Sequence, residues 1–328
     1  MNLLIVVHHK FELWRAPAWF SQRLAEEFPQ LAIVHRDSYD GLEPNLREAE
    51  IIFTISLRPE QFLACEKLRW IHTPTAAVHQ FLFPELVNSS VILTNSTEVH
   101  GPVVAEHVIA LVFALAKKLP QAAALQHKHE WGKETIWSKG AHPKEIHGAT
   151  LGLVGLGSIG RRVARMGAAL GIRVLAVREH VEKPKPEGVD AVYSSSQLDE
   201  VLRQSDFVVL AAPLTPQTTK LMDAKRFAVM KADSYVINVG RGPQIDEAAL
   251  AEALRARRIA GAALDVFDQE PLPADSPLWD IENLFITPHT AGITDKLWER
   301  HYENFSGNLR RYLTKQPLQY VVDKHKGY

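Results

Sequence analysis

The sequence contains a single cysteine, Cys65, among its 328 residues. One thiol cannot form an intramolecular disulfide, and it cannot supply a cysteine cluster for a metal. A lone cysteine is most often a small buried hydrophobe. We therefore expect no disulfide framework, and a reducing, cytoplasmic location is the default.

An excess of one charge and long apolar runs are also lacking. The 37 Lys and Arg residues nearly balance the 38 Asp and Glu residues, so no net field would attract nucleic acid or an anionic membrane surface. The opening MNLLIVVHHK has too short an apolar run for a signal peptide core or a membrane span. Neither nucleic acid nor membrane is an expected partner, and the opening run predicts a β-strand.

Hydrophobic residues are plentiful, at 46% of the chain, and a chain of this length favours two cores because single cores rarely grow past about 250–300 residues. Short β-branched runs alternate with stretches of helical length, which indicates an α/β fold with parallel sheets. The first series of expected strands is Leu3–Val7, Leu31–Val34, Ile51–Ile55 and Val91–Leu93. The second series is Thr150–Val154, Arg173–Val177, Phe207–Ala211, Tyr235–Val239, Gly261–Val266 and Leu284–Thr287.

Two segments of helical length define the expected domains. Pro102–Lys118 opens with proline, closes on two lysines and connects the two series of strands. Lys296–Leu313 leads into a C-terminal segment that we expect to return to the first domain. The prediction is a discontinuous domain of residues 1–98 and 293–328, and a second domain of residues 99–292.

The tract of residues 119–147 has no strand character and carries Trp131 and Trp137 among charged residues. It is too long for an ordinary connection, and exposed tryptophans are typical of interfaces. We expect an arm that contacts a second subunit, with packing against the chain's own body as the open alternative.

A glycine pattern follows the connecting helix. In LGLVGLGSIGRR, Gly155, Gly157 and Gly160 have the G-x-G-x-x-G spacing between an apolar strand and a helical stretch. Such glycines allow a tight turn, backbone access to a pyrophosphate and close packing of the helix on the strand. The free N–H groups at the helix start favour an anion. The pattern predicts a dinucleotide site.

Arg178 lies at the end of the next strand, where NAD-binding proteins have a carboxylate that accepts hydrogen bonds from the ribose 2′-OH. An arginine cannot accept those hydrogen bonds, but its planar fork suits a 2′-phosphate. NADP(H) is therefore favoured as the cofactor. NAD(H) stays open because Glu179, one place later, could serve as the ribose acceptor.

Three further segments place polar or charged side chains at the carboxyl ends of strands, where open α/β sheets bind their ligands. They carry Arg241, the carboxylates Asp265 and Glu270, and His289. Arginine can bind a carboxylate through two charge-assisted bonds, and histidine can protonate a carbonyl as a nicotinamide supplies hydride. With a glutamate to orient the histidine, this set is suited to the reduction of a 2-keto acid.

The chain resembles the D-isomer-specific 2-hydroxyacid dehydrogenases in GLGSIG (155–160), PLTPQT (213–218), NVGRG (238–242), DVFDQEP (265–271) and PHTAG (288–292). These motifs occur in the family's order, and the resemblance covers nearly the whole chain. It implies two doubly wound parallel-sheet domains with a cleft between them, one a Rossmann cofactor domain and the other a flavodoxin-like substrate domain. It also implies a homodimer formed through the cofactor domain.

The resemblance implies that Arg241, Glu270 and His289 are catalytic. Arg241 would bind the substrate carboxylate and carbonyl, and Glu270 would orient His289 as the acid–base. Asp265 would meet the nicotinamide carboxamide. The implied cofactor contacts are Gly155, Gly157, Ser158, Ile159, Gly160, Arg178, Pro213, Thr218, Val239, Arg241, Asp265, His289 and Gly292.

The substrate loop departs from the family's Ala-Gly-x-Asp pattern. Ala76 and Ala77 stand at the amide positions expected to face the substrate carboxylate, and His79 replaces the aspartate. The added methyl group of Ala77 restricts positive φ, so an altered pocket is expected. Glyoxylate, hydroxypyruvate and phenylpyruvate all stay open as substrates.

Two other functions are compatible with the same motifs. A formate- or phosphite-type dehydrogenase would share the scaffold, but the formate type has glutamine where Glu270 stands. A dinucleotide-sensing corepressor could retain the same residues. His79 and His100 are expected to have loop or structural roles. No metal is expected, because the histidine pairs at 8–9 and 127–129 have no accompanying carboxylate or cysteine set.

Overall fold

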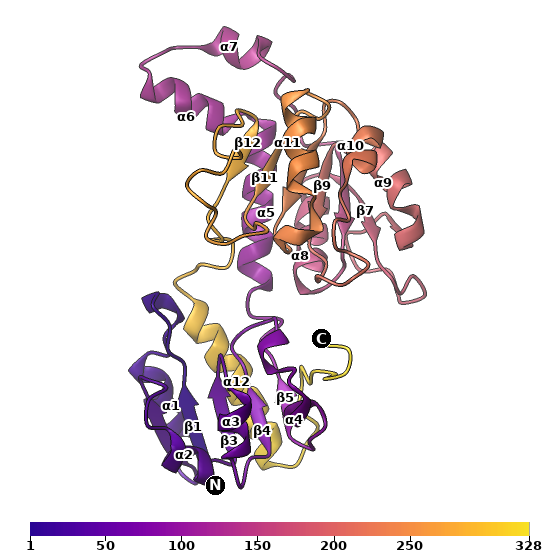
Figure 1. Ribbon diagram of the computed structural model, residues 1–328. Helices are drawn as coiled ribbons and strands as arrows, with labels where there is room; N and C mark the ends of the chain where they lie inside the picture. Colours follow the sequence, from indigo (N-terminus) through magenta and orange to yellow (C-terminus); the bar gives the residue numbers. More distant parts are fainter. Residues whose placement is uncertain (328) are drawn as a thin grey trace. The chain divides into compact units, whose positions relative to one another are not determined.

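The computed structural model describes residues 1–327, which form two compact units. Unit 1 contains Met1–His100 and the C-terminal segment from Thr294, and unit 2 contains Gly101–Ile293. Both ends of the chain therefore contribute to unit 1, as the colours of Figure 1 show.

Unit 1 is built on a parallel sheet with the strand order β2-β1-β3-β4-β5. Its strands are β1 (Asn2–Val6), β2 (Ala32–Arg36), β3 (Ile51–Thr54), β4 (Trp70–His72) and β5 (Ile92–Thr94). Its helices are α1 (Ala18–Glu27), α2 (Glu43–Glu48), α3 (Pro59–Leu63), α4 (Pro84–Val87) and α12 (Leu297–Leu313), with 3-10 turns at Glu12–Trp14 and His79–Phe81. This strand order is that of flavodoxin-like sheets, so the expected fold of this unit is confirmed.

Both faces of the unit 1 sheet are covered. On one face Phe20 of α1 and Phe305 of α12 pack against Phe53 of β3. On the other face Ile52 and Ile71 lie in a second apolar cluster. Burial on both faces explains why the central strands are continuous apolar runs and do not alternate with polar residues.

Unit 2 is built on a larger parallel sheet with the strand order β12-β11-β10-β9-β6-β7-β8. Its strands are β6 (Thr150–Val154), β7 (Arg173–Val177), β8 (Ala191–Tyr193), β9 (Phe207–Leu210), β10 (Tyr235–Asn238), β11 (Gly261–Leu264) and β12 (Leu284–Ile286). Its helices are α5 (Gly101–Ala116), α6 (Leu119–His127), α7 (Lys133–Ser138), α8 (Ser158–Ala169), α9 (Leu198–Gln204), α10 (Ala224–Val229) and α11 (Glu247–Arg255), with 3-10 turns at Ser195–Gln197 and Gly242–Gln244. Counted from β6, the order contains the 3-2-1-4-5-6 arrangement of a Rossmann fold, which confirms the expectation.

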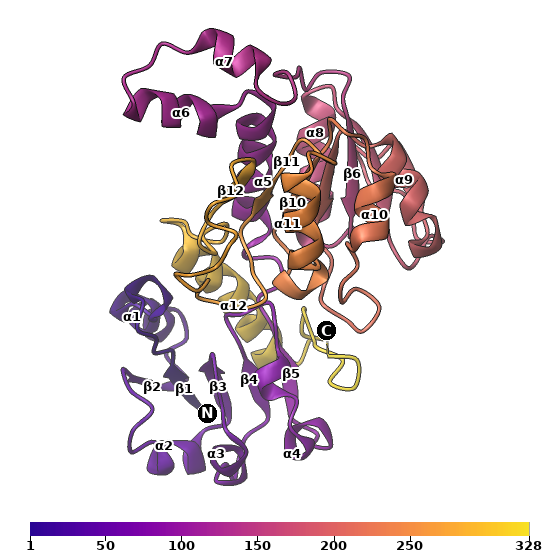
Figure 2. The same ribbon diagram turned by 45° about the horizontal axis from the view of Figure 1, so that its top comes forward.

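Helices cover both faces of this sheet, and the glycine turn between β6 and α8 lies at the carboxyl end of β6. Helices α5 and α8 bury one face together with Leu151, Val209 and Ile237. Helices α9, α10 and α11 bury the other face, and Figure 2 shows them beside the sheet.

Two short strands, β4 and β8, were not expected from the sequence. Strand β4 is a three-residue segment that includes the fully buried polar residue His72, so no apolar run marks it. Strand β8 is an edge strand of partly buried residues. Hydrogen bonding to a neighbouring strand, rather than local pattern, defines both.

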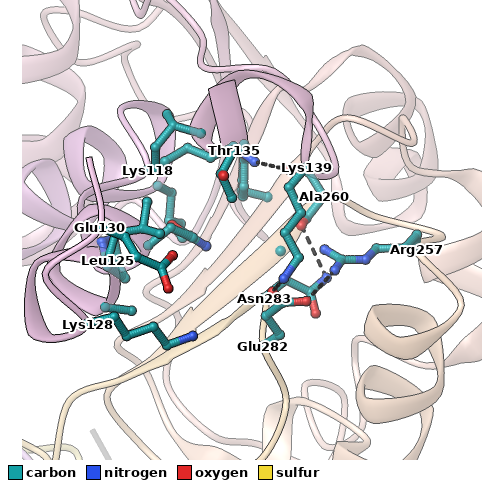
Figure 3. Close-up of a pocket in the computed structure, with 17 residues that line it drawn as sticks. Lys118, Leu125, Lys128, Glu130, Thr135, Lys139, Arg257, Ala260, Glu282 and Asn283 are labelled. Atoms are coloured by element: carbon teal, nitrogen blue, oxygen red, sulfur yellow. Dashed lines mark hydrogen bonds and ion pairs between the residues drawn. The ribbon is translucent and has the colours of Figure 1, made fainter. Parts of the chain in front are cut away.

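The tract after α5 forms an arm of two helices, α6 and α7, which project from the body of unit 2 in Figure 1. Trp131, between the two helices, is 94% exposed, and Trp137, within α7, is 61% exposed. A cavity of about 330 Å³ lies between the arm and the sheet edge. In Figure 3, Lys118 lies on one side of it, and on the other side Glu282 forms ion pairs with both Lys139 and Arg257.

Among the described residues, no single helix has the length and hydropathy needed to cross a membrane. Within residues 1–327, α5 and α6 pass such a test only when taken together, and they are bent by 66° at their junction. Most residues of α5 are buried in the core of unit 2.

Candidate active site

The glycine turn between β6 and α8 has the geometry that its sequence demands. Gly155 has φ of +103°, and a Cβ there would lie 2.7 Å from the Ala212 amide nitrogen. A Cβ on Gly160 would lie 2.1 Å from the Gly155 carbonyl oxygen. A Cβ on Gly157 would meet no atom within 4 Å, so its backbone borders open space that a ligand can approach.

The start of α8 is suited to an anion. Gly157 precedes the helix and provides no side-chain cap, and the N–H groups and dipole at the start of a helix favour a negatively charged group. Ser158 is buried and accepts hydrogen bonds from Arg162 through its carbonyl and hydroxyl oxygens. Ile159 packs against the apolar cluster below. These residues fit the pyrophosphate of a dinucleotide.

Arg178 directly follows β7, beside this turn. Its guanidinium donates hydrogen bonds to the carbonyl oxygens of Val181, Lys183 and Pro184. The side chain therefore holds the loop after β7 in place, while Glu179 is exposed. The structure brings a fixed positive charge to the position predicted from the sequence.

The loops after β9 and β10 are tied together by Gln244, which is fully buried. Its side-chain amide donates to the Pro213 carbonyl oxygen at 3.4 Å and accepts from the Arg241 amide at 3.0 Å. The Thr218 hydroxyl donates to the same Pro213 oxygen at 2.8 Å. Val239 lies at the end of β10 with its side chain buried. Gln244 was not among the predicted residues, because nothing in the sequence distinguishes it from a surface glutamine.

His289 and Glu270 form a close pair. The His289 Nδ1 and Glu270 Oε2 atoms are 2.6 Å apart, and the other oxygen of Glu270 accepts from the Phe267 amide at 3.0 Å. With both of its oxygens in acceptor positions, Glu270 can accept a hydrogen bond from the Nδ1–H of His289, which leaves Nε2 for a ligand. His289 has φ of +52°, an uncommon conformation for a residue other than glycine.

Arg241 lies near this pair. Desolvation by the surrounding protein lowers the pKa of Arg241, while the Glu270 carboxylate acts in the opposite direction. The guanidinium keeps its charge, since arginine is not deprotonated in proteins. It also donates to the Gly240 carbonyl oxygen at 2.7 Å. The predicted catalytic trio thus comes together at one edge of the unit 2 sheet.

Asp265 organises the loop that carries His289. It is 1% exposed, and its carboxylate accepts from the Thr287 hydroxyl at 2.6 Å and from the amides of Thr290 and Ala291 at 2.9 and 3.1 Å. Gly292 follows directly. The structure shows Asp265 engaged with its own chain, a role that the sequence did not suggest.

The predicted substrate loop belongs to unit 1. The carbonyl oxygens of Ala76 and Ala77 accept hydrogen bonds from Asn95 and Thr75. Among residues 1–327 their amides have no hydrogen-bond acceptor, and neither residue has a positive φ. The alanines therefore fit the loop without strain. His79 begins a 3-10 turn.

His100 lies close to His301, with ring centroids 5.8 Å apart. Within the described chain, no group of three or more His, Cys, Asp or Glu side chains is arranged to hold a metal ion. Cys65 is partly buried, and burial raises the pKa of its thiol to about 12, so the thiol is unreactive at neutral pH.

Comparison with known proteins identifies the family. The model of the "D-isomer specific 2-hydroxyacid dehydrogenase, NAD binding domain" matches residues 109–291, and glyoxylate/hydroxypyruvate reductase B from Citrobacter koseri is 35% identical over 81% of this chain and 80% of its own. The chain belongs to the D-isomer specific 2-hydroxyacid dehydrogenase family. This family of oxidoreductases is the one that the sequence motifs suggested, and unit 2 carries its nicotinamide dinucleotide-binding domain.

Two further relatives extend the comparison. D-3-phosphoglycerate dehydrogenase from Methanocaldococcus jannaschii is 30% identical over 92% of this chain, which spans 57% of that relative's length. The D-isomer specific 2-hydroxyacid dehydrogenase from Xanthobacter autotrophicus, solved in complex with NADPH and MES, has a TM-score of 0.83 at 29% identity and covers 99% of both chains. The fold is therefore shared over 99% of the chain.

Proposed function

We propose that the chain catalyses the NAD(P)H-dependent reduction of a 2-keto acid to a D-2-hydroxy acid, and the reverse reaction. The observation that carries this proposal is the 2.6 Å pair of His289 and Glu270 beside Arg241. The pair lies in the unit that holds the dinucleotide-binding turn. Family membership supports the same reaction.

Each residue has a defined role in this proposal. A bound nicotinamide supplies the hydride. Arg241 binds the substrate carboxylate and polarises the carbonyl. His289 donates the proton from Nε2 to the carbonyl oxygen. Glu270 holds the proton on Nδ1 and so fixes the ring in the productive orientation.

The names of relatives favour small substrates. The Citrobacter koseri relative is a glyoxylate/hydroxypyruvate reductase, so glyoxylate and hydroxypyruvate are the first candidates, with phenylpyruvate as a bulky comparison. The test is the initial rate of NADPH oxidation with this panel, for the wild type and for His289→Asn. We expect turnover by the wild type and a loss of about 10²–10⁴-fold in the variant; no turnover with any 2-keto acid would refute the proposal.

We propose NADP(H) as the preferred cofactor. Arg178 supports this, because its guanidinium is fixed at the end of β7 by three carbonyl oxygens and could also bind a 2′-phosphate. The Xanthobacter autotrophicus structure contains NADPH. Arg178→Asp should remove a preference for NADPH of about tenfold, equivalent to about 1.4 kcal/mol. Glu179→Gln is the matched control: if it abolishes NADH use and Arg178→Asp changes nothing, Glu179 binds the ribose.

We propose that the arm contacts a second copy of the chain. Its two helices carry the exposed Trp131 and Trp137, and exposed tryptophans of this kind are typical of interface anchors. Sedimentation equilibrium should give a dimer for the wild type and a monomer for Trp131→Glu. A wild type that sediments as a monomer would contradict this proposal.

A further inference from the structure

His107 is distant in the sequence from the loop that carries His289, but its side chain contacts this loop at Thr287. It lies on α5, and its side chain is about one-fifth exposed. Its Nε2 atom is 3.2 Å from the Thr287 hydroxyl and 3.7 Å from the Asp265 Oδ1 atom. The proposed reaction gives this imidazole no part.

The hydrogen bonds at this point have a defined direction. Thr287 donates its hydroxyl proton to Asp265 at 2.6 Å, so its oxygen lone pairs can accept from the Nε2–H of His107. Burial lowers the pKa of His107, while Asp265 acts in the opposite direction. A neutral ring that carries its proton on Nε2 satisfies this chain of donors and acceptors.

Asp265 connects Thr287 to the backbone around His289 through hydrogen bonds. Its carboxylate binds the amides of Thr290 and Ala291, which follow His289, and its backbone oxygen accepts from the His289 amide at 2.9 Å. These bonds hold His289 at φ of +52°. A buried carboxylate keeps its position only when all its partners are in place.

We propose that His107 is a positioning residue for His289, acting through Thr287 and Asp265. The inference rests on the proposed function in so far as His289 is the acid–base. His107 fixes the rotamer of Thr287, which in turn fixes the carboxylate that binds the loop. Loss of the Nε2 donor lets the loop move, and a displacement of about 1 Å at a reacting group can cost about 10²-fold in rate.

The kinetic test compares His107→Leu with His107→Gln, whose side-chain amide can replace the Nε2 donor. We expect the leucine variant to lower kcat by about 10–100-fold while the Kd for NADPH, measured by fluorescence titration, changes by less than about twofold. Glutamine should restore kcat to within about threefold of the wild type. His325→Leu is the matched control, because His325 is an exposed histidine of unit 1.

Thr287→Val removes the same bond from its other side. It should lower kcat as His107→Leu does, and the double variant should be no worse than either single variant within about threefold, because both changes break one chain of bonds. Additive losses, a kcat for His107→Leu within twofold of the wild type, or a glutamine variant as slow as the leucine variant would each overturn the proposal.

Amide hydrogen exchange tests the positioning without the reaction. Thr290 and Ala291 should exchange at least about tenfold faster in His107→Leu than in the wild type, His107→Gln or His325→Leu. Unchanged exchange would overturn the proposal. If the wild type reduces no 2-keto acid, the proposed function fails, and the exchange rates alone decide whether His107 holds the loop.

Discussion

Unit 1 should become less stable as the pH falls from 7.5 to 5, because it buries neutral histidines. His72 is fully buried in β4, and burial lowers its pKa to about 3. Its Nε2 lies 3.2 Å from the Ser96 hydroxyl, and its Nδ1 lies 2.7 Å from the Thr94 hydroxyl. Ser96 donates its own hydroxyl proton to the Thr73 carbonyl oxygen at 3.1 Å, so it accepts from Nε2–H. In a neutral ring Nδ1 then accepts from the Thr94 hydroxyl, whose oxygen also accepts from Trp70 at 2.8 Å.

The sign and size follow from proton linkage. The pKa of His72 is lower in the folded state than the ordinary value of about 6.5, so its contribution is complete above that value and is lost as the pH falls toward 3. At pH 5, about 1.5 units below the ordinary pKa, the loss is about 2 kcal/mol at about 1.4 kcal/mol per unit. His301 is also buried, and its pKa is likewise lowered well below the ordinary value, so it adds a loss of the same sign.

The assay is urea unfolding at pH 7.5 and pH 5, with amide exchange in β4 as the reporter for unit 1. His72→Gln removes the titrating group, so the variant should lose about 2 kcal/mol less than the wild type over this range, whatever its stability at pH 7.5. Equal losses in both proteins would refute the reasoning. His325→Gln is the matched control, because His325 is an exposed histidine of the same unit.

Three further substitutions test the site. Gly160→Ala brings a Cβ to 2.1 Å from the Gly155 oxygen, so it should lower the melting temperature and weaken NADPH binding. The Cβ of Gly157→Ala meets no protein atom within 4 Å, so this variant should weaken NADPH binding at least tenfold while its melting temperature stays within about 2 °C of the wild type. Calorimetry measures the melting temperature, and fluorescence titration measures the binding. Glu270→Gln keeps an oxygen acceptor for His289 but removes the charge, so kcat should fall about 10²-fold or more with little change in the Kd for NADPH. An unchanged rate of hydride transfer, measured by stopped flow, would contradict the role assigned to Glu270.

The sequence predicted the parts of the fold that have a local signal. The central strands are buried on both faces and therefore read as apolar runs, and the turn at Gly155 requires glycine because of its positive φ. The same reasoning located Arg241, Glu270 and His289, because strand ends in parallel sheets share one edge. The family comparison confirms the fold and the oxidoreductase class.

Other features depend on tertiary structure and had no local signal. His107 lies 180 residues from Thr287 in the sequence, and nothing in its helix distinguishes it from a surface histidine. Gln244 is a similar case, since its importance comes from two loops that meet only in the folded chain. The role of Asp265 in holding the His289 loop likewise depends on backbone amides, which carry no sequence signature.

The central claim is hydride transfer to a 2-keto acid with proton donation by His289. The most direct measurement incubates the protein with hydroxypyruvate and NADPH deuterated at the transferable C4 position, and analyses the product by mass spectrometry and chiral chromatography. The account predicts D-glycerate with one deuterium at C2, formed at a rate at least 10²-fold lower in His289→Asn. Product without deuterium at C2, the L isomer, or an undiminished rate in the variant would contradict it.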